Sequence, residues 1–147
     1  MRFVVWSLLI AAAIVAGGAS AAPVNKLGNY GDWALLGDTP ESPKLCFLTA
    51  TPQATSPEGL KREPGCIYVS AWPKDGIRSE LSFLLGFTAK KTEAVTAVVG
   101  GSTFAMFSKD RRAFIDDPTQ ELKLLEAMKK GAKLVVSATS ERGTAIT

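Results

Sequence analysis

Histidine is absent from the 147 residues of this chain, and cysteine occurs only twice. Without an imidazole, the chain can form neither a Ser-His-Asp nor a Cys-His catalytic arrangement. The glycine-rich phosphate loops G-x-x-x-x-G-K-[ST] and G-x-G-x-x-G are missing as well. These absences exclude the commonest nucleophilic and nucleotide-dependent enzymes, and they leave carboxylates as the main candidate catalytic groups.

Two carboxylates can hydrolyse a glycoside, but the acidic residues of this sequence cluster little. Asp116-Asp117 is the only adjacent acidic pair. Asp117 also suits the N-cap of a helix, because the residues Pro-Thr-Gln follow it. Glu80 lies near Asp75, beside a turn, where acidic residues are usually solvated. We therefore predict no enzymatic activity, no cofactor and no bound metal, with a small envelope hydrolase that uses carboxylates as the alternative.

The one long apolar run lies at the N-terminus. Arg2 is the only charge before Lys26, residues 3–16 are apolar, and Ala19-Ser20-Ala21 fits an A-x-A cleavage site. A run of 14 residues is shorter than the ~20 of a membrane-spanning helix, which disfavours the alternative of a retained anchor. We predict a signal peptide over residues 1–21, a single mature domain over residues 22–147, no membrane span after cleavage, and a periplasmic or secreted location.

Neither sign of charge is in large excess. The chain has 17 basic and 14 acidic residues, and removing Arg2 with the signal peptide lowers the formal charge from +3 to +2. So small and mixed a balance argues against nucleic acid as a partner. Lys109, Arg111 and Arg112 form the densest basic cluster. We interpret this cluster as a solvated loop, with an anion site as the alternative.

Cys46 and Cys66 are the only cysteines. An even number of cysteines in an exported chain predicts a disulfide, because the compartments outside the cytoplasm are oxidising. A metal site is poorly supported without histidine or a C-x-x-C spacing, and a reactive thiol would lack a histidine base. We therefore expect one Cys46–Cys66 bridge.

Short apolar segments separated by glycine and proline predict a mainly β protein. The expected strands cover residues 33–36, 45–50, 66–72, 80–85, 95–99, 103–107, 112–115, 133–139 and 144–147. Residues 24–32 are expected to form a lead-in arm and residues 52–65 a long surface loop. The Gly-Gly pair at 100–101 predicts a hairpin turn. Seven or more short strands predict an antiparallel β-sandwich.

A single helix interrupts this pattern near the C-terminus. Residues 118–130 carry Leu122, Leu125 and Met128 at helical spacing, and Gly131 suits the position just after the last turn. We predict that this stripe packs against the sheet with Leu125 at its centre.

Trp33, Tyr68 and Trp72 are the three aromatic candidates for a binding platform. Aromatic side chains on strands belong to the core more often than to the surface, and we expect this of Trp33 and Tyr68. Trp72 differs because it runs into the turn Pro-Lys-Asp-Gly, which makes that end of the strand the better surface candidate. The candidate binding surface consists of Trp72, Lys74, Asp75 and the turn residue Arg142.

Six segments carry a family resemblance that spans nearly the whole mature chain. They are Gly31-Asp32-Trp33, Leu45-Cys46-Phe47, and residues 70–76 (SAWPKDG), 119–122 (TQEL), 127–131 (AMKKG) and 138–144 (ATSERGT). In this order they resemble the invasion-associated locus B family of bacterial exported proteins. The resemblance implies an immunoglobulin-like β-sandwich in the periplasm or at the cell surface. It also implies an association with bacterial entry into host cells, and no established catalytic activity.

The sequence departs from that family at its C-terminal end. Family members usually continue past the Arg-Gly-Thr turn into a complete strand and a short apolar tail, whereas this sequence ends at Thr147. The resemblance therefore implies a half-built last hairpin. We expect an unpaired edge on part of strand 133–139, or on the other strand that the missing segment would have met, through which the chain would self-associate or accept a partner's strand. Our leading hypothesis is an exported cell-envelope or secreted binding or structural module with an unidentified protein or envelope partner. A truncated, non-functional family member is a further alternative.

Overall fold

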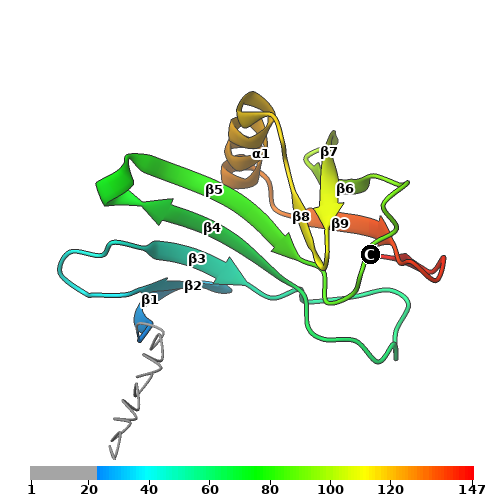
Figure 1. Cartoon of the computed structure of the whole chain (residues 1–147), viewed down its shortest axis with the longest axis horizontal. Helices are drawn as coiled ribbons and strands as arrows, with labels where there is room; N and C mark the ends of the chain where they lie inside the picture. Colours follow the sequence, from blue (N-terminus) through cyan, green and yellow to red (C-terminus); the bar gives the residue numbers. More distant parts are fainter. Residues whose placement is uncertain (1–22) are drawn as a thin grey trace, which may run out of the picture.

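The computed structural model describes residues 23–147 (Figure 1). Its elements are β1 (Asn25–Tyr30), β2 (Trp33–Gly37), β3 (Cys46–Ala50), β4 (Cys66–Trp72), the 3₁₀ turn η1 (Pro73–Asp75), β5 (Ile77–Leu84), β6 (Val95–Val99), β7 (Ser102–Lys109), β8 (Arg112–Phe114), α1 (Pro118–Lys130), β9 (Leu134–Thr139) and β10 (Ala145–Ile146). The predicted signal peptide lies outside the described residues. Within them, no helix is both long and apolar enough to cross a membrane.

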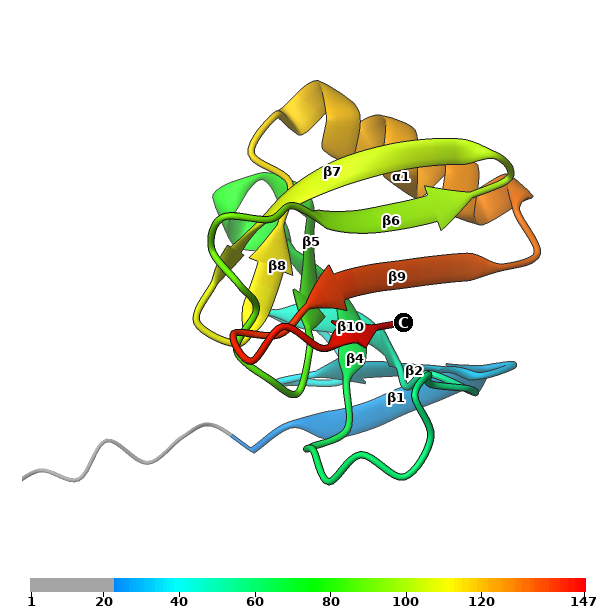
Figure 2. The same ribbon diagram turned by 90° about the vertical axis from the view of Figure 1, so that its right-hand side faces the viewer.

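All ten strands belong to one antiparallel sheet, in the order β1-β2-β3-β4-β5-β8-β7-β6-β9-β10. The sheet bends: Figure 2 shows β6, β7 and β9 along their length, whereas β4 and β5 are seen along their length in Figure 1. β7 joins the two parts, because it pairs with β6 and, at its end, with β8. The predicted mainly antiparallel β fold with one helix near the C-terminus is confirmed. The immunoglobulin-like sandwich is not, because the strands form one continuous sheet.

β1 is the strand that the sequence pattern did not predict. Residues 24–32 are expected to be a lead-in arm, but Asn25–Tyr30 pairs antiparallel with β2. Gly31 makes the turn between the two strands with φ of 60°, a left-handed conformation that glycine adopts without steric cost. Most of β1 is exposed, and its polar residues therefore carry no strand signal.

The hydrophobic core lies on the inner face of the sheet. Leu81 and Phe83 of β5, Ala113 of β8 and Met106 of β7 share this face, and each is at most 3 % exposed. Side chains at the alternating positions of the same strands point to the outer face. The two faces thus separate the residues that stabilise the fold from those that are available for binding.

Helix α1 packs against β6 and β7. Asp117 caps its N-terminus as predicted, because its carboxylate accepts a hydrogen bond of 2.8 Å from the Thr119 N–H. Gly131 follows the helix in an extended conformation, with φ of −88°. A Cβ at Gly131 would clash with Cγ1 of Val99, and glycine therefore permits the close approach of helix and strand rather than a left-handed cap.

The helix is rotated relative to the predicted stripe. Leu124 is fully buried, whereas Leu122 is 58 % exposed. Leu125 and Met128 are only half-buried, and Ala127 lies with them against the core. The predicted stripe is therefore wrong at Leu122, and Leu124 replaces Leu125 as its centre. The small side chain of Ala127 on the inward side gives little hydrophobic signal.

The expected disulfide is also wrong for this structure, in which Cys46 and Cys66 are both free. Cys46 pairs with Ala71, which lies five residues along β4 from Cys66. At about 3.3 Å per residue this separation is roughly 17 Å, far beyond the ~7 Å between Cα atoms that a disulfide allows. Cys46 shares the inner face with Ala71, whereas Cys66 lies on the outer face.

Candidate functional site

A row of paired residues crosses the outer face of five strands. Thr49, Tyr68, Ser82, Phe114 and Phe107 are successive partners in β3, β4, β5, β8 and β7. Directly paired residues place their side chains on the same face of a sheet, and the row is therefore continuous. Phe107, at one end of it, is 47 % exposed. An aromatic ring of this exposure at a rigid strand position is available to a ligand.

Two aromatic pairs lie on this face. The ring centroids of Phe107 and Phe114 are 5.6 Å apart, with 28° between the ring planes. Those of Phe47 and Tyr68 are 5.8 Å apart, with 59° between the planes. Both separations are within the range of favourable aromatic contacts. Because each pair joins neighbouring strands, the strand register itself holds the rings in place.

Arg112 connects the second pair to the turn between β7 and β8. Its Cζ lies 5.5 Å from the centroid of the Tyr68 ring, a cation–π geometry. A contact with the Cys66 side chain, together with burial, raises the pKa of Tyr68, while the positive charge of Arg112 lowers it. The Tyr68 hydroxyl therefore stays protonated at neutral pH and contributes no charge to this face.

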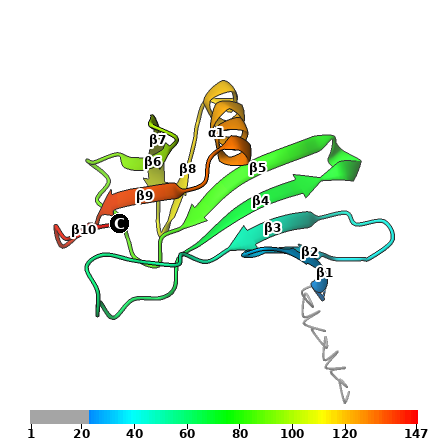
Figure 3. The same cartoon turned by 180° about the vertical axis from the view of Figure 1, so that it is seen from behind.

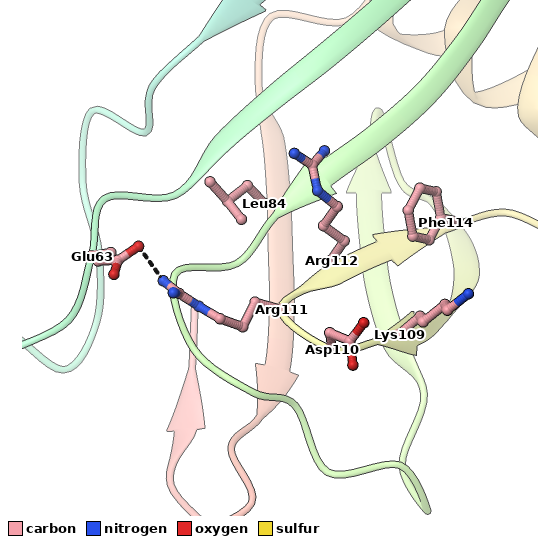
Figure 4. Close-up of a pocket in the computed structure, with 7 residues that line it drawn as sticks. All are labelled: Glu63, Leu84, Lys109, Asp110, Arg111, Arg112 and Phe114. Atoms are coloured by element: carbon pink, nitrogen blue, oxygen red, sulfur yellow. Dashed lines mark hydrogen bonds and ion pairs between the residues drawn. The ribbon is translucent and has the colours of Figure 1, made fainter. Parts of the chain in front are cut away.

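A pocket of about 240 Å³ opens beside Arg112 (Figure 4). Its lining consists of Glu63, Leu84, Lys109, Asp110, Arg111, Arg112 and Phe114. Lys109 and Arg112 are direct partners across the turn between β7 and β8. Asp110 has a φ of 54° in that turn, a left-handed conformation that aspartate tolerates better than most residues. The tight turn thus places several charged residues around one pocket, from which Arg111 extends toward Glu63 and Arg112 toward Leu84.

The charges of the pocket divide into satisfied and free groups. Arg111 and Glu63 form an ion pair, drawn as a dashed line in Figure 4. This contact lowers the pKa of Glu63 and raises that of Arg111. Within residues 23–147, Lys109 and Arg112 take part in no ion pair. The pocket therefore presents two cations that remain available to an anion.

Three acidic residues, Glu63 of the pocket together with Glu121 and Asp117, are each engaged by another group of the fold. A glycosidase needs one carboxylic acid of raised pKa, but the pKa of Glu63 is lowered by Arg111. Burial raises the pKa of Glu121, but this residue lies on α1 and accepts a hydrogen bond from the Leu81 N–H. Asp117 serves as the helix cap. The described residues also contain no acidic or cysteine cluster suited to a metal ion.

The structure separates the binding surface that the sequence predicted. Trp72 ends β4, and Lys74 and Asp75 lie in η1 at the tip of the β4–β5 hairpin. Arg142 lies in the turn between β9 and β10. Figures 1 and 3 show that hairpin tip and that turn at opposite ends of the molecule's longest axis. Arg142 therefore shares no surface with the other three residues.

Sequence reasoning identified parts of the observed site without connecting them. Tyr68 stood among the aromatic candidates, and the basic cluster at 109–112 was interpreted as a loop. The missing link is Phe107, which follows the buried residue Met106 and so points outward. Phe107 lies an odd number of residues from both Phe104 and Met106, and the alternation of a strand therefore places it on the face opposite to theirs. This alternation is the signal that could have identified Phe107 as a surface aromatic residue.

Comparisons with known protein families, with curated proteins and with solved structures found no match in any of the three. The resemblance to the invasion-associated locus B family rests on its six sequence segments alone.

Proposed function

We propose that this protein is an exported binding module of the bacterial cell envelope, and that it recognises its partner through the outer face of the sheet without catalysing a reaction. The observation that carries this proposal is the stack of the exposed Phe107 on the half-buried Phe114, beside Lys109 and Arg112, which form no ion pair within residues 23–147. Exposed aromatic rings next to arginine are enriched where proteins bind partners. The envelope location is supported by the signal-peptide pattern of residues 1–21.

The first test concerns export. The full chain is expressed in a Gram-negative host, and the cytoplasmic, periplasmic and medium fractions are analysed by mass spectrometry. The proposal expects a processed protein that begins at Ala22 in the periplasm or the medium. Unprocessed protein confined to the cytoplasm would contradict the envelope location.

The second test concerns the binding face. The processed protein, its Phe107→Ser variant and its Arg112→Ser variant serve as bait for envelope extracts. Matched controls are Ile77→Ser, which alters an apolar side chain 42 % exposed at the β4–β5 hairpin, and Arg142→Ser in the β9–β10 turn. Circular dichroism verifies that every variant is folded.

The expected result is that Phe107→Ser and Arg112→Ser each lose the captured material while both controls retain it. Truncating a central contact residue typically costs tenfold or more in affinity, which capture readily detects. If instead Arg142→Ser or Ile77→Ser abolishes capture while Phe107→Ser does not, binding occurs on another surface. If the protein were a hydrolase, the captured ligand would be chemically altered after incubation. The proposal expects the ligand to be recovered unaltered.

A further inference from the structure

The free cations and the stacked rings of the outer face form one short ladder. Phe107 pairs with Phe114, and Lys109 pairs with Arg112, in successive same-face positions of β7 and β8. Two residues along a strand correspond to roughly 7 Å, and the ring pair and the cation pair therefore lie side by side. A single ligand unit can touch both at once.

We infer that this ladder binds an acidic polysaccharide chain, with sugar rings lying on Phe107 and Phe114 and their carboxylates facing Lys109 and Arg112. This inference rests on the proposed function and names the class of ligand for the same face. The two parts of the ladder match the two parts of a uronic acid unit, which has an apolar ring face and one carboxylate. Arg112 suits the carboxylate, because its planar guanidinium can donate two parallel hydrogen bonds.

The charge of the site favours widely spaced carboxylates over a densely charged polymer. Three basic and two acidic residues line the pocket, an excess of one positive charge. Because Glu63 already holds Arg111, the field that an incoming ligand meets comes from Lys109 and Arg112, partly offset by Asp110. Nucleic acid carries one charge per ~1.7 Å of duplex and is bound by many cations, which this face lacks.

The shape of the site argues against a lipid chain or a peptide strand. Phe107 is 47 % exposed, so that the ring pair is an open platform rather than an enclosure for an acyl chain. Around the ladder, β8 is paired on both sides, by β5 and β7, and offers no free backbone edge for strand addition. Recognition here has to come from ring faces and cationic side chains.

The chain contains a built-in reporter for this face. Cys66 lies two residues before Tyr68 on the same face of β4. It pairs with Leu84 of β5, and Leu84 pairs on its other side with Arg112 of β8. Cys46 lies on the opposite face of the sheet. A ligand that covers the Arg112 region slows the alkylation of Cys66 and leaves the alkylation of Cys46 unchanged.

The decisive experiment titrates the processed protein with hexagalacturonate by calorimetry and by maleimide labelling of the two cysteines. The matched ligand is the fully methyl-esterified hexamer, which keeps the sugar chain and removes the charge. The proposal expects at least about tenfold tighter binding of the free acid, weakening with added salt, and selective protection of Cys66. Arg112→Ala and Lys109→Ala each reduce affinity for the free acid about tenfold, whereas Arg142→Ala does not.

Phe107→Ala distinguishes stacking from charge, because it weakens both the free acid and the ester. Equal binding of acid and ester, or no binding of either, overturns the inference. Tighter binding of a thymidine oligonucleotide or of hexaglutamate also overturns it, in favour of nucleic acid or of an acidic peptide. If envelope capture depends on Phe107 and Arg112 but hexagalacturonate does not bind, the proposed function stands and the ligand class is wrong. If capture is independent of both residues, both proposals fail.

Discussion

Leu124 is the residue of α1 whose burial the structure defines most sharply, and Leu122, two positions away, is its natural control. Leu124 is fully buried and Leu122 is 58 % exposed. We predict that Leu124→Ala lowers the free energy of unfolding by about 2–5 kcal/mol, the range for emptying a core site. Leu122→Ala should lower the free energy of unfolding by less than about 0.5 kcal/mol, because the exposed side chain is not part of the core. Both variants replace leucine with alanine in the same helix, and helix propensity therefore does not account for the difference between them. Urea denaturation of the two variants measures the difference, and equal losses would contradict the observed rotation of the helix.

Glu121 gives a second prediction at this scale, through pH. Burial raises the pKa of Glu121, with repulsion from Glu80 adding to the effect, while the hydrogen bond from the Leu81 N–H lowers it. The folded state therefore holds the proton more tightly than the unfolded state. The stability contributed by this group is present below the ordinary pKa of a glutamate and is lost as pH rises through the raised value.

The variant Glu121→Gln keeps an oxygen that can accept the hydrogen bond from Leu81 and removes the charge. We predict that this variant is more stable than the wild type at about pH 7 and equally stable at about pH 3, where the carboxyl is protonated. Denaturant titration of both proteins at the two pH values measures the difference between their free energies of unfolding. The other titrating groups are common to both proteins, and their contributions cancel in this difference. A wild type that is the more stable protein at neutral pH would show that the charged carboxylate is favoured.

The residues show where sequence reasoning reached its limit. Asp117 was correctly predicted as a helix cap because that role depends on neighbours two residues away. The side of α1 that faces the core was not correctly predicted, because Ala127 and Gly131 contribute close packing there and carry little hydrophobic signal. The Cys46–Cys66 bridge failed for a related reason, since the register of β3 and β4 is set by long-range pairing that the cysteines do not reveal.

Among the elements, β9 is paired along most of its length on one side and along only a smaller part of its length on the other. Its Leu134–Ser137 segment pairs with β6, whereas β10 covers only Ala138 and Thr139 on the other side. Along Leu134–Val136, the described part of the chain places no strand opposite β6. Such an edge can accept another strand.

We predict that the processed protein self-associates reversibly through this edge, with sedimentation coefficients that rise with concentration. Val135→Lys, which places a charge on the edge strand, should keep the protein monomeric. Thr96→Lys, on β6 between two paired neighbours, is the matched control and should leave the association unchanged. A wild type that remains monomeric at high concentration would mean that β9 is protected in another way.

The strands themselves were well predicted, with β1 as the exception. Strands with an alternating or apolar pattern, such as β4 and β6, reveal themselves through burial. β1 is recruited by hydrogen bonding to β2 and has no buried residue, so that its sequence carries no comparable signal. The order of the strands, and with it the single bent sheet, depends on contacts between distant segments that local patterns do not encode.

At the scale of the whole molecule, the free thiols make stability independent of redox conditions. We predict that a reducing agent shifts the melting temperature of the processed protein by less than about 1 °C, and that Cys46→Ser behaves like the wild type. A bridge that closed a loop of about 20 residues would contribute about 3 kcal/mol, a shift of more than about 10 °C in a domain of this size. Differential scanning calorimetry with and without dithiothreitol distinguishes the two outcomes.

The candidate site also belongs to this scale, because residues from β3, β4, β5, β7 and β8 compose it. The sequence indicated its cations, as a cluster around one turn, and Tyr68 as one of three aromatic candidates. It did not indicate that Phe107 and Phe114 stack, or that Arg112 reaches Tyr68, since these contacts require the order β4-β5-β8-β7. Arg142 was grouped with Trp72 for the same reason, although the two lie at opposite ends of the molecule.

The single strand order has a mechanical consequence. β1 and β10 are the outermost strands of the sheet, and a pulling force applied between them acts across the strands. The strands then peel apart one after another, and only a few hydrogen bonds carry the load at any moment. The paired backbone hydrogen bonds between Ser56 and Thr147, of 2.7 and 2.8 Å, would break first.

We predict that optical-tweezers handles attached at β1 and β10 unfold the protein in several small steps at low force. Handles attached at Cys46 and Cys66 pull the antiparallel neighbours β3 and β4 from opposite ends along their length, and the hydrogen bonds between these two strands then share the load. This second geometry should therefore resist until a single rupture at higher force. The protein would be soft when stretched by its edges and stiff along the strands that carry its binding face.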